Sequence, residues 1–69
     1  MSKLLLPKDI YSVRTINKAI NDFSEVATIN MCLSEEHHVC DFTKTIYDPK
    51  ETMSEFENYL IDLCNQIGL

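Results

Sequence analysis

The sequence predicts a small α+β fold, in which two amphipathic helices cover one face of a three-stranded sheet. Apolar and polar residues alternate through residues 27–33 and again through residues 39–46, which is typical of strands with one buried face. Residues 13–23 and 53–67 instead carry apolar side chains three and four positions apart, as amphipathic helices do. A chain of 69 residues is expected to form one domain, residues 1–69, with a thin core.

The two alternating stretches are expected to pair as a β-hairpin. One register places both apolar sets on the same face, with Leu33 opposite Cys40 and Met31 opposite Phe42. The segment between the strands contains no glycine and no Asn-Gly pair, which disfavours a tight two-residue turn. We therefore expect a four-residue loop over residues 35–38.

The segments on either side of the hairpin carry start and stop signals. The apolar run Lys3–Leu6 ends at Pro7, which indicates a short strand or a frayed terminus. Ser12 is the expected N-cap of the first helix, because its hydroxyl can accept a hydrogen bond from an amide of the first turn. The second helix is expected to begin at 48–51, where a carboxylate cap precedes a proline, or at 52–55, which offers a second cap.

These elements follow in the order strand, helix, strand, strand, helix. A right-handed crossover makes the first two strands parallel, and the hairpin makes the third strand antiparallel to the second. We expect the third strand in the middle of a mixed sheet with both helices on one face, a ferredoxin-like arrangement that lacks its last strand. The first strand then lies at an open edge, where main-chain groups can pair with another strand. Leu4, Leu5 and Leu6 are its predicted partner-binding residues.

Charge and composition narrow the possible functions. Residues 21–69 carry ten acidic residues against two lysines, which disfavours nucleic-acid binding because phosphate neutralisation needs clustered lysine and arginine. No apolar run is long enough to span a membrane, and the apolar part of the first residues is too short for a secretory signal. Three cysteines without such a signal predict a reducing, cytoplasmic location.

A single cluster in the sequence has the residue types of a metal site, namely Cys32, His37, His38 and Cys40. Its spacing fits no zinc pattern, the predicted register separates the two cysteines onto opposite faces of the sheet, and both histidines are expected in a solvated loop. The four residues are therefore weak metal candidates. The lone glycine excludes phosphate-cradling loops, and no nucleophile stands in a glycine-rich elbow. We expect neither a cofactor nor catalysis.

Several short stretches together resemble a known family of small proteins. They are Ile10-Tyr11-Ser12, Lys18-Ala19 in the helix that follows, residues 27–33, and Glu55-Phe56-Glu57-Asn58-Tyr59-Leu60. In these stretches the chain is similar to the HxsD-like proteins of the His-Xaa-Ser system. The resemblance implies a non-enzymatic accessory protein that accompanies radical-SAM peptide-modifying enzymes, and it carries over no catalytic residue.

The sequence leaves three functional hypotheses. The first is a cytoplasmic adaptor that binds a peptide or protein segment along the edge strand at Leu4–Leu6. The second is a homodimeric interaction protein, in which the same edge pairs with a second copy and supplements the thin core. The third is a metal or redox role for the cysteine and histidine cluster.

Overall fold

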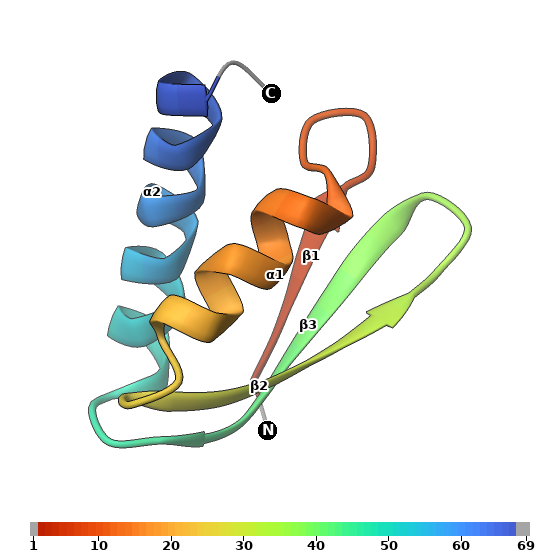
Figure 1. Cartoon of the computed structure of the whole chain (residues 1–69). Coiled ribbons are helices and arrows are strands. Elements are labelled where there is room, and N and C mark those ends of the chain that lie inside the picture. Colours follow the sequence, from red (N-terminus) through yellow and green to blue (C-terminus); the bar gives the residue numbers. More distant parts are fainter. Residues whose placement is uncertain (1, 68–69) are drawn as a thin grey trace.

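The computed structural model describes residues 2–67, which fold into an α+β domain of two layers. Its elements are β1 (Ser2–Pro7), α1 (Val13–Asp22), β2 (Ala27–Leu33), β3 (His37–Thr45) and α2 (Pro49–Ile67). The strands form one sheet, and both helices lie on the same side of it (Figure 1). Within the described range, no helix is long and apolar enough to cross a membrane.

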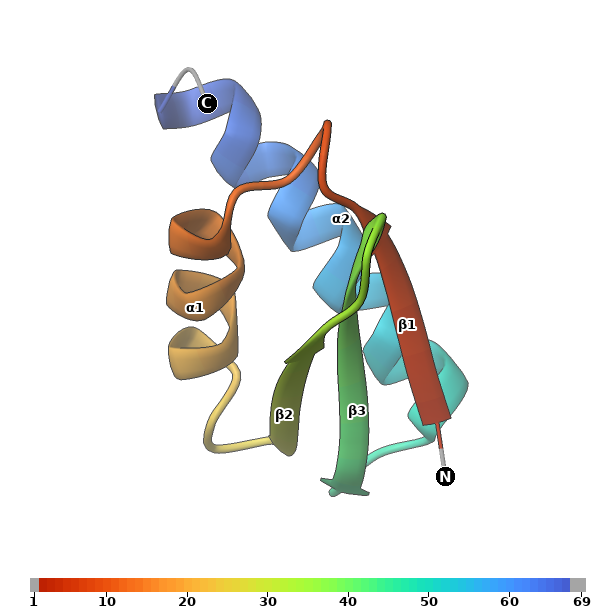
Figure 2. The same ribbon diagram turned by 90° about the vertical axis from the view of Figure 1, so that its right-hand side faces the viewer.

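The third strand, β3, lies between the other two and pairs antiparallel with both. The prediction of a mixed sheet is therefore wrong. The strands β1 and β2 do run in the same direction, but β3 separates them, so that no parallel ladder forms. As a result, β1 forms one edge of the sheet and β2 forms the other (Figure 2).

The hairpin register differs from the predicted one by two residues. Leu33 lies opposite His38 rather than Cys40, and Met31 lies opposite Cys40 rather than Phe42. A shift by two residues keeps the same side chains on the same face, so the apolar pattern cannot distinguish the two registers. Leu33 is nevertheless 66% exposed, because the helices leave the turn end of the hairpin uncovered (Figure 1).

The predicted four-residue loop is also wrong, since β3 already begins at His37. The amide and the hydroxyl of Ser34 both donate hydrogen bonds to the His37 carbonyl oxygen, at 2.9 and 3.0 Å. The Ser34 hydroxyl oxygen in turn accepts from the His37 amide at 3.1 Å. These bonds let a serine close a short turn that lacks glycine, and they bring both histidines into the strand.

Both helices begin where their predicted capping residues lie. The hydroxyl oxygen of Ser12 accepts a hydrogen bond from the Thr15 amide at 3.2 Å, and α1 follows directly. The carboxylate of Asp48 accepts from the Glu51 amide at 3.2 Å, so α2 starts at Pro49, the earlier of the two predicted positions.

One apolar core joins the sheet to both helices. Its centre is Phe56 of α2, which is fully buried. The Phe56 ring packs edge-to-face against Phe42 of β3 and against Phe23 at the end of α1, with ring centroids 5.3 and 5.2 Å apart. Because Phe56 contacts both layers, α2 holds the sheet and α1 in one unit.

Candidate functional site

The candidate site is the edge of β1 that faces away from β3. Just beyond the last paired residues of the ladder, Pro7 and His37, the Lys8 amide donates a hydrogen bond to the Glu36 carbonyl at 3.2 Å. Hydrogen-bonded and non-bonded pairs alternate along an antiparallel ladder. The even-numbered residues of β1 therefore direct their main-chain groups toward β3, and the odd-numbered residues direct theirs away from the sheet.

Two residues of β1, Lys3 and Leu5, supply the pairing groups of this edge. The third outward-facing residue is Pro7, which has no amide hydrogen. Its carbonyl already accepts hydrogen bonds from the amides of Ile10 and Tyr11, at 3.2 and 3.1 Å. Lys3 and Leu5 each present one donor and one acceptor to an incoming strand, which gives the edge four pairing groups.

The three predicted leucines do not form one side-chain surface. Leu6 is fully buried, Leu4 is half-buried against the core, and Leu5 is 59% exposed on the face that the helices do not cover. Successive side chains of a strand point to opposite faces. The Leu5 side chain and the exposed part of Leu4 are therefore accessible to a partner, whereas Leu6 is part of the core.

The open face of the sheet carries an apolar row that ends at this edge. Leu5 lies opposite Val39 in the centre of the sheet, and Val39 lies opposite Cys32 at the far edge. The next row holds Lys3 and Asp41, and one carboxylate oxygen of Asp41 is buried without a hydrogen-bond partner. A strand added at β1 would extend both rows.

Among residues 2–67, no element pairs with the outer edge of β1. The helix α2 packs against β1 and β3, and in Figure 2 its first turns lie beside the start of β1, whereas α1 lies beyond β2. The outward main-chain groups of Lys3 and Leu5 therefore have no strand beside them within the described range.

The cysteine and histidine candidates are divided between the two faces of the sheet. Cys32 is exposed on β2, while Cys40 lies in the core, where burial raises the pKa of its thiol to about 11. His37 is half-exposed and His38 is only 5% exposed, so the prediction of two solvated loop histidines is wrong. Within residues 2–67, no three His, Cys, Asp or Glu side chains form a group that could hold a metal ion.

His38 is buried, which differs from the prediction made from the sequence. Its Nδ1 atom is buried and has no hydrogen-bond partner. His38 has the same parity as Cys40 and Phe42, which both face the core. Continuing the alternation of β3 toward the turn would have placed this histidine on the buried face.

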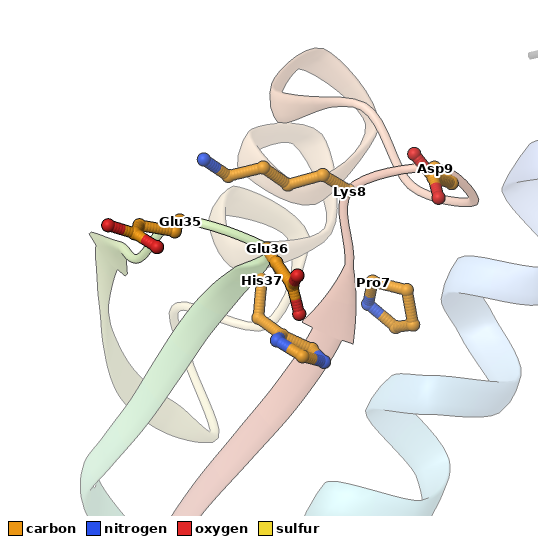
Figure 3. A pocket seen from close by; sticks show the side chains of 6 residues that line it. All are labelled: Pro7, Lys8, Asp9, Glu35, Glu36 and His37. Carbon is orange, nitrogen blue, oxygen red and sulfur yellow. The ribbon is translucent and has the colours of Figure 1, made fainter.

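A cavity of about 540 Å³ lies between the connection after β1 and the turn of the hairpin (Figure 3). Its lining consists of Pro7, Lys8, Asp9, Glu35, Glu36 and His37. Figure 3 shows the side chains of Lys8, Asp9 and Glu35 pointing in different directions rather than toward a common point. This arrangement provides neither a ligand set for a metal nor a nucleophile beside a base.

Comparisons of the chain with protein-family models, with curated proteins and with solved structures give no match. Within residues 2–67, the fold and the candidate site define a small α+β domain whose sheet has an unpaired edge at β1.

Proposed function

We propose that this chain is a non-enzymatic adaptor, which binds an extended segment of a peptide or protein by strand addition to β1. The observation that carries the proposal is the direction of the main-chain groups of Lys3 and Leu5, on an edge with which no described element pairs. Strand addition derives its affinity from such groups and its selectivity from the neighbouring side chains.

The side chains beside the edge indicate what the bound segment should look like. A residue opposite Leu5 extends the apolar row that continues through Val39. A neighbouring residue of the segment, on the helical side of the sheet, covers the half-buried Leu4. A segment with apolar side chains on both faces at this point therefore fits best.

A more specific assignment of the fold also favours strand addition at β1. We propose that the domain is a ferredoxin-like arrangement without its last strand, and that the bound segment takes the place next to β1. The resemblance to HxsD-like proteins supports a cytoplasmic accessory role beside radical-SAM enzymes that modify peptides. On this proposal, the segment belongs to such an enzyme or to its peptide substrate.

The test compares two lysine substitutions on the open face. Leu5→Lys alters the β1 edge, and Thr28→Lys adds the same charge at an exposed position of β2. Peptides selected from a random displayed library on the unaltered protein should bind Leu5→Lys at least about tenfold more weakly and bind Thr28→Lys unchanged. Far-UV circular dichroism checks that both variants fold. Equal binding to folded Leu5→Lys rules out the edge.

A further inference from the structure

We infer that β1 also pairs with β1 of a second copy of this chain, in one register, with Leu4 on the two-fold axis. The inference rests on the proposed strand addition, because a second copy uses the same main-chain groups as a foreign segment. In the resulting dimer, two sheets join edge to edge into one continuous antiparallel sheet, and the helices of both copies lie on the same side of it.

The register follows from the pairing groups of the edge. With Leu4 opposite Leu4 of the second copy, Lys3 lies opposite Leu5 of the second copy, and Leu5 lies opposite Lys3 of the second copy. Each of these two pairs exchanges two hydrogen bonds, because the donors and acceptors of Lys3 and Leu5 all point outward. In this register, every outward-facing donor and acceptor of Lys3 and Leu5 has a hydrogen-bond partner in the second copy.

The neighbouring symmetric registers are less favourable. If Leu5 lies on the axis, Lys3 meets Pro7, which has no amide hydrogen and whose carbonyl is already bonded to Ile10 and Tyr11. If Lys3 lies on the axis, two lysines stand directly opposite each other, and like charges in that position are destabilising. The edge is therefore self-complementary with Leu4 at the centre.

Apolar surface above the edge supports the same arrangement. Leu4 is half-buried on the helical side of β1, and at the axis it packs against its own copy.

A second copy also has an energetic advantage over a flexible peptide. Its β1 strand is already extended and held by β3, so pairing does not require an unstructured segment to become ordered. A foreign segment must therefore compete with the second copy for Lys3 and Leu5.

Sedimentation velocity over a range of concentrations tests the inference with Lys3→Pro and the matched control Lys3→Ala. The proline removes an outward amide hydrogen, which β3 does not use, and proline is tolerated at the edge of a sheet. The alanine shortens the same side chain but keeps that hydrogen. We expect Lys3→Pro to dimerise at least about tenfold more weakly than Lys3→Ala, because two hydrogen bonds of the dimer are lost. Circular dichroism verifies that both are folded.

Amide hydrogen exchange of the unaltered protein gives a second, independent readout. Protection of the Leu5 amide should rise with protein concentration, whereas the Leu4 amide, bonded to β3, should be protected throughout. A chain that stays monomeric up to about 1 mM, or a dimer in which Leu5 exchange does not depend on concentration, overturns the inference. If that monomer still binds selected peptides through Leu5, the proposed function stands; if it binds none, both fail.

Discussion

Two adjacent leucines of β1 should respond very differently to truncation. Leu6 is fully buried, whereas Leu5 is 59% exposed on the open face. Leu6→Ala removes a buried side chain and leaves a cavity, which costs about 3–5 kcal/mol. Leu5→Ala should cost less than about 1 kcal/mol, as exposed substitutions do. A domain of 69 residues has a free energy of unfolding of about 3–10 kcal/mol, so Leu6→Ala removes a large part of its stability.

Urea unfolding, followed by far-UV circular dichroism, measures both variants. Low micromolar protein concentrations keep self-association from contributing to the stability of Leu5→Ala. The m-value should stay the same for both, because each substitution changes stability rather than the surface exposed on unfolding. Equal losses for the two variants, or a larger loss for Leu5→Ala, would refute the assignment of these leucines to opposite faces and with it the direction of the edge groups.

Three further substitutions test the N-cap of α2, the buried His38 and the hydrogen bond between Tyr59 and Asp22. Asp48→Ala should lower the free energy of unfolding by about 1 kcal/mol in urea titrations, because the Glu51 amide loses its acceptor. His38→Leu should raise the free energy of unfolding by about 1 kcal/mol, since an unpaired buried nitrogen is replaced by an apolar group. Destabilisation by this substitution would contradict the absence of a hydrogen-bond partner for His38. The Tyr59 hydroxyl donates a hydrogen bond to Asp22 and so holds the pKa of that carboxyl below 3.8. This stabilisation is complete above pH 3.8 and is lost as the pH falls through the lowered pKa, so the stability difference between the unaltered protein and Tyr59→Phe should shrink in acid. A difference that does not change with acidification argues against the bond.

The candidate site could be predicted from the sequence only in part. The run of leucines before Pro7 indicates a short strand, but chain order and crossover handedness leave open whether that strand is central or at the edge. The pairing of β3 with both other strands places β1 at the edge. The sequence does not reveal that Leu6 belongs to the core and that Lys3 belongs to the site. Both facts depend on which β1 residues direct their main-chain groups toward β3, and the pairing with β3 decides this.

The sequence by itself determined the elements and their faces, because local chemistry encodes them. The alternation in β2 and β3, the spacing of apolar residues in the helices, and the caps at Ser12 and Asp48 act over a few neighbouring residues. Only the tertiary structure decided the hairpin register and the residue at which β3 begins. Registers two residues apart bury the same side chains, so the choice between them depends on the Ser34 turn and on packing across the sheet.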